Sequence, residues 1–154
     1  MKVSPADAEL DINELSTHVV VLYDGVCGLC NRLNRFLIKR DRRDRFRFAP
    51  LQSRFASHVL RRHGVEPARL DTIYVVYAYE RRDESLWAKG IAISYLLREI
   101  GGVWGVAASG FGILPHGLRD RLYDLVAGHR YQLFGKYQIC PTPLPQDRKK
   151  FIEV

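Results

Sequence analysis

Hydrophobic and polar residues follow two periods in the first part of the chain, one typical of a strand and one of a helix. Residues 19–23 form an unbroken apolar run rich in β-branched side chains, which predicts a central strand covered on both faces. Asp24 and Gly25 indicate a tight turn. A helix then begins near Cys27. Its apolar positions share one face and are Leu29, Leu33, Phe36 and Leu37.

The next two elements follow from the same periods. Residues 45–49 alternate between apolar and basic side chains, which predicts a half-exposed strand at the edge of a sheet. Ser53 can cap a following helix, and Gly64 is placed to end it. The apolar positions of this helix are Phe55, Val59 and Leu60. The order of elements up to this point is β-α-β-α.

A hairpin and another helix complete the predicted core. Residues 72–79 form a second strongly apolar strand, and a charged connection at 80–84 leads to a shorter strand at 86–88. The short connection predicts an antiparallel pair. Residues 91–100 predict a helix that ends at two glycines. The resulting order, β-α-β-α-β-β-α, is that of a thioredoxin-like α/β fold with a mixed four-stranded sheet.

The rest of the chain is predicted to be helical and then extended. Residues 102–114 are apolar but too short to span a membrane, so we expect them in the core. Pro115 can begin a helix, and residues 129–136 predict another short one. Prolines at 141, 143 and 145 exclude regular structure. Residues 141–154 are therefore expected to form an extended tail on the surface.

Length and composition indicate one domain. A chain of 154 residues suits a single core, which we place at residues 18–140, with helices added after the thioredoxin-like part. Residues 1–17 are acidic and lack an apolar segment, so we expect a loose or partly helical tail rather than a signal peptide or anchor. Three cysteines are too few for a disulfide-stabilised secreted fold, which favours a reducing, cytoplasmic location.

Cys27 and Cys30 carry the clearest chemistry in the sequence. A C-x-x-C that follows a buried strand and opens a helix is typical of thiol-disulfide exchange, although zinc sites use the same spacing. Unpaired amides and the helix dipole favour a thiolate at Cys27. We therefore expect Cys27 to be reachable from solvent and to attack a disulfide. Cys30, one turn further along, would resolve the mixed disulfide.

Other residues are candidates for supporting roles. Asp24 can cap the turn or accept the proton of Cys30, and Gly25 tolerates the backbone angles of a sharp turn. Cys140 is interpreted as an inert packed thiol or, alternatively, as an auxiliary redox thiol. The five histidines form no spaced ligand cluster with the cysteines. We therefore expect no metal and no cofactor apart from the Cys27–Cys30 disulfide, with a zinc site at the three cysteines and a histidine as the alternative.

Positive charge is concentrated in one part of the chain. The formal net charge is +7, and residues 31–63 contain eleven Arg and Lys against two Asp. The simplest interpretation is a solvated face. The alternative is a docking surface for an acidic partner, a nucleic acid, or glutathione as an anionic co-substrate. Neither an aromatic-basic RNA motif nor zinc-finger spacing is present, which argues against nucleic acid.

Several separated motifs resemble those of the DCC family of predicted thiol-disulfide oxidoreductases. They are YDGVCGLCNRLNRFLIKRD, FRFAPLQS, LDTIYVV and LYDLVAGHRYQLFGK, followed by Cys140. The family is named after an Asp-Cys-Cys pattern, which Asp24, Cys27 and Cys30 match. The resemblance implies a thioredoxin-like fold and a dithiol/disulfide activity, and it permits an auxiliary role for Cys140. It also implies that Arg130 helps to pack the last motif over the domain by pairing with a buried acid.

One element of thioredoxins is missing from the sequence. Thioredoxins and glutaredoxins usually carry a cis-proline before the third strand, where it faces the C-x-x-C and docks extended substrate. This chain has Leu70, Asp71 and Thr72 there. The thioredoxin mode of substrate binding is therefore not transferred to this chain, and Thr72 is retained as an auxiliary candidate.

Three hypotheses of function follow from these observations. The first is a protein-disulfide or dithiol oxidoreductase that acts on a disulfide-containing protein or a small thiol. The second is a redox-inert adaptor that binds an acidic partner through the basic face. The third is a small zinc-binding module. The sequence predicts no membrane span, and it does not specify the substrate, the direction of exchange or the oligomeric state.

Overall fold

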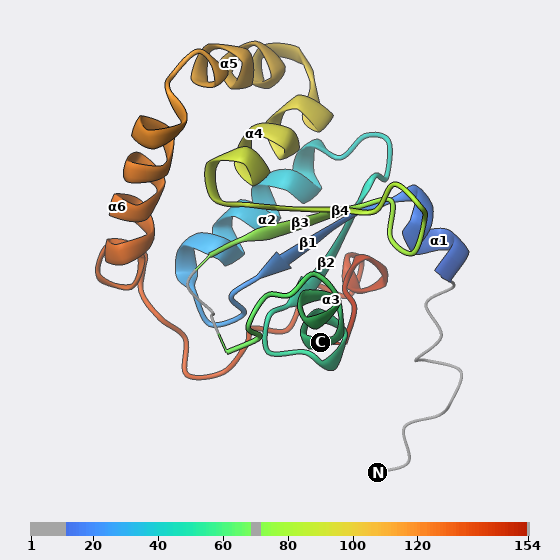
Figure 1. Cartoon of the computed structure of the whole chain (residues 1–154). Coiled ribbons are helices and arrows are strands. Elements are labelled where there is room, and N and C mark those ends of the chain that lie inside the picture. Colours follow the sequence, from blue (N-terminus) through green and yellow to red (C-terminus); the bar gives the residue numbers. More distant parts are fainter. Residues whose placement is uncertain (1–11, 69–71, 154) are drawn as a thin grey trace, which may run out of the picture.

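A mixed four-stranded sheet lies at the centre of the computed structural model, which describes residues 12–68 and 72–153 (Figure 1). The strands are β1 Val19–Tyr23, β2 Phe46–Pro50, β3 Tyr74–Tyr77 and β4 Ser85–Ala88, in the spatial order β2-β1-β3-β4. β2 is parallel to β1, whereas β3 is antiparallel to both β1 and β4. The predicted order of elements and the mixed four-stranded sheet are therefore confirmed, and they are consistent with a thioredoxin-like fold.

Helices cover both faces of this sheet. They are α1 Ile12–Thr17, α2 Gly28–Arg40, α3 Arg54–Arg62, α4 Lys89–Ile100, α5 Gly102–Gly112 and α6 His116–Phe134, followed by a short 3₁₀ turn, η2 Arg148–Lys150. Figure 1 shows α2 and α4 on one face and α3 on the other, with α6 running along the side. The chain therefore has the layered arrangement that a sheet with two apolar faces requires.

The central strand β1 is buried on both faces, as its composition predicts. Val19, Val21 and Tyr23 belong to the apolar cluster that includes residues of α2 and α4. Val20 and Leu22 belong to the cluster that includes residues of α3. Successive side chains of a strand point to opposite faces of the sheet. Every residue of β1 must therefore be apolar for the strand to pack into both clusters.

The strand β2 lies at the edge of the sheet as predicted, but the expectation that it is half exposed is wrong. All five of its residues are buried, and Arg47 is only 4% exposed. Arg47 pairs with Glu14 at 2.6 Å and with Asp44 at 3.1 Å, which neutralises its charge. The alternating pattern predicts that Arg47 faces solvent. In the structure Glu14 and Asp44 enclose it instead.

The end of the chain contributes to burying β2, which corrects the prediction of a purely extended surface tail. Phe151 forms a parallel bridge with Phe48. The amide of Ile152 donates a hydrogen bond to the carbonyl of Phe48 at 2.8 Å, and the Ile152 side chain is buried. Residues near 151 therefore act as a short additional edge beside β2.

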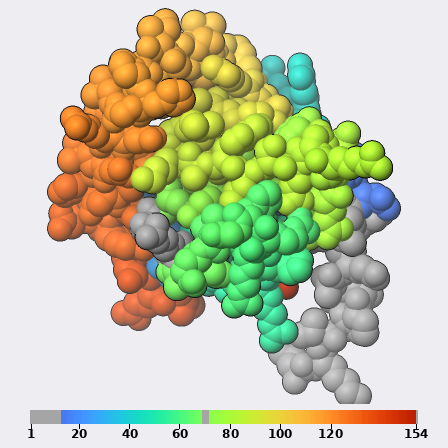
Figure 2. Space-filling view, in the orientation of Figure 1, coloured from blue at the N-terminus to red at the C-terminus, as the bar shows by residue number. Residues whose placement is uncertain are grey.

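The expectation that residues 102–114 belong to the core is also wrong. They form α5, which lies with α6 at the outer margin of the molecule (Figure 2, yellow to orange). Val103 and Val106 are 74% and 73% exposed. α6 is one continuous helix to Phe134, so the separate short helix predicted at 129–136 does not exist. In the residues that the structure describes, no helix is long and apolar enough to cross a membrane.

The chain ends are described in part. Residues 12–17 of the predicted acidic tail form α1, where Leu15 is buried against the sheet. The remainder of that prediction falls on residues 1–11, outside the described residues. Leu70 and Asp71, which stand where thioredoxins carry a cis-proline, also lie outside them. Thr72, the third residue of that segment, is described.

Candidate functional site

The junction between β1 and α2 places Cys27 at the amino end of a helix. Cys27 is the N-cap residue of α2, with an extended backbone (φ −80°, ψ 124°), and its carbonyl accepts the first helical hydrogen bond from Asn31 at 3.1 Å. The amides of the next residues have no partner within the helix. The strand and the helix therefore place the sulfur of Cys27 beside the N–H groups of Leu29 and Cys30 at the start of the helix, as the sequence predicts.

The environment of Cys27 favours its thiolate. Cys30 comes within 3.6 Å of Cys27. A hydrogen bond from the Cys30 thiol, together with the N–H groups of Cys30 and Leu29, lowers the pKa of Cys27 to about 6 in spite of burial. The predicted acidity of Cys27 thus has a structural cause.

Cys30 has the opposite character. Its hydrogen bond to Cys27, burial and the negative charge of Cys27 raise the pKa of the Cys30 thiol far above its usual value. Two adjacent sulfurs cannot both be ionised at low cost, so one thiolate is stabilised at the expense of the other. The pair holds one charge, on Cys27, and one proton, on Cys30.

Asp24 lies buried at the end of β1 and binds several groups at once. Its Oδ1 accepts hydrogen bonds from the amide of Val26 at 3.2 Å and from Nε2 of Gln52 at 2.9 Å. Its Oδ2 accepts from the hydroxyl of Tyr131 and pairs with Arg130 at 3.4 Å. Asp24 thus caps the turn at the amide of Val26, and it is the buried acid that pairs with Arg130.

Gly25 supports the turn for a different reason from the one predicted. Its φ lies outside the left-handed region, so no unusual backbone angle demands glycine. A Cβ atom at Gly25 would instead lie 2.8 Å from Sγ of Cys140 and 3.1 Å from Oε1 of Gln52. The position is restricted by side chains that arrive from distant parts of the chain, which a sequence pattern does not reveal.

Cys140 faces the turn rather than the pair of thiols. Its Sγ lies 4.0 Å from the hydroxyl of Tyr23. Burial raises the pKa of the Cys140 thiol, and the charge of Asp24 acts in the same direction. Its auxiliary redox role stays a prediction.

Two polar residues of the site were missed by the sequence analysis. Asn31 is buried in α2, and its Nδ2 donates to the carbonyls of Gly25 at 3.0 Å and Cys27 at 2.9 Å. Gln52 donates to Asp24 and accepts from the amide of Gly25 at 3.1 Å. Both residues satisfy backbone groups of the turn. The available signal was their position inside two of the motifs that resemble the DCC family.

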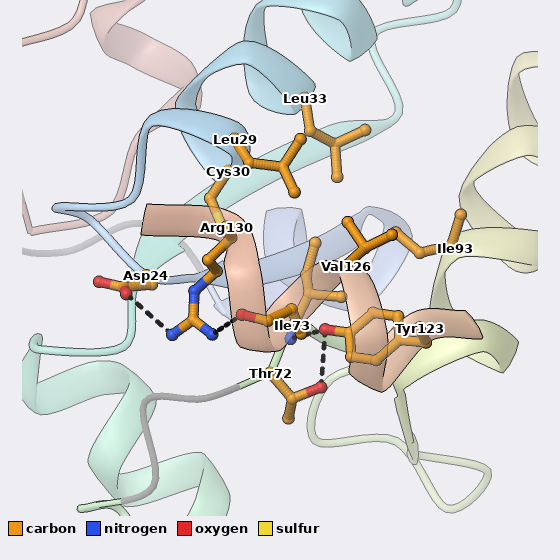
Figure 3. A pocket seen from close by; sticks show the side chains of 11 residues that line it. Asp24, Leu29, Cys30, Leu33, Thr72, Ile73, Ile93, Tyr123, Val126 and Arg130 are labelled. Atoms are coloured by element: carbon orange, nitrogen blue, oxygen red, sulfur yellow. Dashed lines mark hydrogen bonds and ion pairs between the residues drawn. The ribbon is translucent and has the colours of Figure 1, made fainter. Parts of the chain in front are cut away.

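A small cavity of about 70 Å³ opens beside Cys30 (Figure 3). Leu29, Leu33, Ile93 and Val126 provide apolar walls, while Asp24, Arg130 and Thr72 lie at its polar side. The hydroxyl of Thr72 donates to Oη of Tyr123 at 2.8 Å, and Tyr123 also accepts from the amide of Ile73 at 2.9 Å. Thr72 therefore lines the same cavity as Cys30, although its own hydroxyl binds α6.

A segment after α6 covers Cys27. We call residues 135–140 the strap. Lys136 forms an antiparallel bridge with Cys27. The amide of Gly28 donates to the carbonyl of Gly135 at 3.0 Å, and the amide of Tyr137 donates to the carbonyl of Val26 at 2.7 Å. Cys27 is 0% exposed, so the expectation that its sulfur is reachable from solvent is wrong for this conformation.

The alternative raised by the sequence is a zinc site at the three cysteines and a histidine. Among residues 12–68 and 72–153, no group of three or more His, Cys, Asp and Glu side chains is arranged to hold a metal ion. The hydrogen bonds of Asp24 are directed to protein donors.

Comparison with known proteins points to the same chemistry. A family model described as DCC1-like thiol-disulfide oxidoreductase matches residues 21–136, which include Cys27, Cys30 and the first two residues of the strap. The match extends from within β1 to the bridge partner of Cys27. It therefore spans both sides of the site.

Two curated relatives cover most of this chain. The uncharacterized protein YuxK of Bacillus subtilis is 33% identical over 133 residues, which are 86% of this chain and 93% of YuxK. A DCC family protein of Arabidopsis thaliana, described as chloroplastic, is 31% identical over 121 residues, which are 79% of this chain and 67% of that protein. No solved structure matches this chain significantly.

Proposed function

The chain belongs to the DCC1-like thiol-disulfide oxidoreductase family, and we propose that it exchanges disulfides through Cys27 as nucleophile and Cys30 as resolving thiol. The observation that carries the proposal is the proximity of Cys27 and Cys30 together with their different protonation states. The two thiols come within 3.6 Å at the amino end of α2, with pKa values displaced in opposite directions. One sulfur is ionised for attack while the other keeps its proton.

The reaction consists of two exchanges. The thiolate of Cys27 attacks one sulfur of a substrate disulfide, forms a mixed disulfide with it, and releases the other substrate sulfur as a thiolate that takes up a proton. Cys30 then loses its proton and attacks Cys27, which forms the 27–30 disulfide and releases the remaining substrate thiolate. Two electrons pass from the protein dithiol to the substrate. The reverse sequence oxidises a substrate dithiol.

Formation of the mixed disulfide changes the state of Cys30. Once Cys27 is bonded to the substrate it carries no charge, so the hydrogen bond and the negative charge that raise the pKa of Cys30 are removed. Cys30 then ionises more easily, at the step that requires its thiolate. The hypothesis that Asp24 accepts this proton stays a prediction.

Asp24 and Arg130 position and polarise the site in this proposal. The charge of Arg130 lowers the pKa of Cys27, and its pairing with Asp24 holds it beside the cavity that Cys30 lines. Burial, with the hydrogen bond to Asp24, raises the pKa of Tyr131 to about 12, so its hydroxyl remains a donor to Asp24. These contacts keep the positive charge near the thiolate without placing it in solvent.

The test is thiol trapping across a glutathione redox titration. We expect the wild-type protein to form a 27–30 disulfide in one two-electron step, and Cys30→Ser to accumulate glutathione on Cys27. Cys140→Ser is the matched control and should titrate like the wild type. Absence of the 27–30 disulfide at every ratio of glutathione to its disulfide would refute the proposal.

The same titration bears on two finer expectations. It tests glutathione as a co-substrate and gives the direction of exchange from the reduction potential. The low number of cysteines in the sequence fits a reducing compartment, and a cytoplasmic location is part of the proposal. A potential well above that of the cytosolic glutathione pool would argue for an oxidising role instead.

A further inference from the structure

The strap hides the residue that the proposed function requires to be the nucleophile. Cys27 exposes none of its surface, because the strap residue Lys136 lies directly opposite it in an antiparallel bridge. Cys30 is partly exposed and lines the cavity, but its thiol is protonated. In this conformation the ionised sulfur is covered, and a disulfide reaches it only where the strap is displaced.

The way the strap pairs with the junction indicates what the covered surface can bind. The two hydrogen bonds join Gly28 to Gly135 and Val26 to Tyr137, so they flank the opposed residues Cys27 and Lys136. This is the pattern of a non-hydrogen-bonded antiparallel pair. Side chains of such a pair lie on the same face, with Cβ atoms about 4.5–5.5 Å apart. A cysteine at the place of Lys136 would therefore face the sulfur of Cys27.

The junction side of this pairing is a fixed edge. Val26 and Cys27 precede the helix, so the carbonyl of Val26 is not needed within α2. The amide of Gly28 has no acceptor within α2 and is free to bind the strap. A Cβ atom at Gly28 would lie 2.0 Å from the carbonyl oxygen of Phe134. Glycine between the two cysteines thus allows another backbone to approach closely.

The strap side is exposed and weakly held by comparison. Residues 135–139 are exposed, and Ile139 is 79% exposed. Gly135, at the end of α6, has a φ of +81°, a conformation in which glycine lets the chain change direction. Two backbone hydrogen bonds join the strap to residues 26–28. A segment held in this way can be exchanged for another with the same backbone.

We propose that the strap is a resident pseudosubstrate, and that the substrate is an extended polypeptide segment that displaces it and pairs with Val26 and Gly28. The substrate cysteine takes the place of Lys136 opposite Cys27. The proposal rests on the proposed function and names its substrate class. Cys27 bonds to the sulfur of that cysteine, and the substrate's other sulfur leaves as a thiolate that is protonated by water.

The pairing makes a directional prediction about the peptide. The residue after the substrate cysteine must donate its N–H to Val26, as Tyr137 does, whereas the residue before it only accepts from Gly28, as Gly135 does. Proline lacks the N–H. Proline after the cysteine should therefore weaken pairing, and proline before the cysteine should not.

The first experiment uses two unstructured peptides whose single cysteine carries a thionitrobenzoate leaving group, one with proline directly after the cysteine and one with proline directly before it. The full-length reduced protein should react about fivefold more slowly with the first peptide, because one hydrogen bond is lost. The matched peptide with proline before the cysteine should react within about twofold of one without proline. Equal rates for the two proline peptides would overturn the proposal.

The second experiment changes the strap itself. Tyr137→Pro removes the donor to Val26, and Gln138→Pro, one residue further along the exposed strap, is the matched control. We expect Tyr137→Pro to increase alkylation of Cys27 by iodoacetamide about fivefold, with little change in the control. An unchanged rate in Tyr137→Pro would count against displacement of the strap.

A third measurement does not depend on a proline variant that folds. In a Cys30→Ser background, Lys136→Cys should form a disulfide between Cys27 and the introduced thiol under mild oxidation, whereas Tyr137→Cys should not, because its side chain points to the other face. Peptide mapping identifies the bond. Equal cross-linking of both variants would remove the geometrical basis of the proposal. Normal formation of the 27–30 disulfide with failure of these tests would leave the proposed function intact.

Discussion

The junction at residues 24–30 and the strap at residues 135–140 face each other, and each carries cysteine, yet their sulfurs differ. The junction places Cys27 at a helix end beside a second thiol, which lowers its pKa to about 6. The strap ends at Cys140, where burial without comparable donors raises the pKa. The difference shows that local N–H groups and a neighbouring thiol lower the pKa of a cysteine, whereas proximity to the site alone does not.

The largest expected effect separates the two regions directly. Cys27→Ser should lower the rate of disulfide exchange by about 10³-fold or more, because the nucleophile is lost. Cys140→Ser should leave the rate within about twofold. The measurement is turnover of a mixed-disulfide peptide with glutathione as reductant. If both substitutions reduced the rate equally, Cys140 would have an auxiliary role and the contrast between the regions would fail.

The second prediction concerns pH. A thiol reacts as its thiolate, so alkylation of Cys27 should rise with pH through a midpoint near 6, while that of Cys140 should still be rising above pH 9. At pH 7 Cys27 should therefore be mostly thiolate, while Cys140 should be almost entirely thiol. Mass spectrometry of the labelled peptides measures both sites in one sample. A common midpoint for the two cysteines would contradict the assigned environments.

The third prediction tests how closely the two regions approach each other. Gly28→Ala places a Cβ against the carbonyl of Phe134 and should destabilise the reduced protein by about 1–3 kcal/mol. Gly105→Ala is the matched control in an exposed helix, because its Cβ would meet nothing within 4 Å. It should stabilise by up to about 1 kcal/mol. Denaturant unfolding measures both variants, and equal effects would mean that the approach at Gly28 is easily relaxed.

The smallest expected effect concerns the contribution of Arg130 to the low pKa of Cys27. Arg130→Gln removes a positive charge that lowers the pKa of Cys27, so the midpoint of its alkylation should rise by less than about one pH unit. Arg32→Gln removes an exposed cation of α2 and is the matched control. A drop in the midpoint on loss of Arg130, or an equal rise in both variants, would contradict this role of Arg130.

Much of the fold could be predicted because its signals are local. The apolar run of β1, the change of period after Gly25 and the cap at Ser53 each lie within a few residues of the element that they specify. The side chain of Ser53 accepts from the amide of Ala56 at 3.1 Å, as its position predicts. The acidity of Cys27 is predictable for the same reason, since its amide donors are the next residues along the chain.

The features that were not predicted depend on contacts between distant residues. The strap reaches Cys27 across more than one hundred residues, so no pattern near Cys27 indicates its burial. Gly25 is restricted by Cys140, and Arg47 is neutralised by Glu14. The apolar composition of α5 predicts a place in the core, but its valines are exposed. Hydrophobicity alone does not indicate whether the sheet has room for another helix.

The attachment of Phe151 and Ile152 beside Phe48 has a consequence for the behaviour of the chain in concentrated solution. An uncovered edge strand offers unpaired backbone groups to a strand of another molecule and thus promotes self-association. Here the carbonyl of Phe48 is occupied by the amide of Ile152 from the same chain. Phe151 and Ile152 therefore limit sheet extension at β2, and a protein shortened before residue 151 should aggregate more readily.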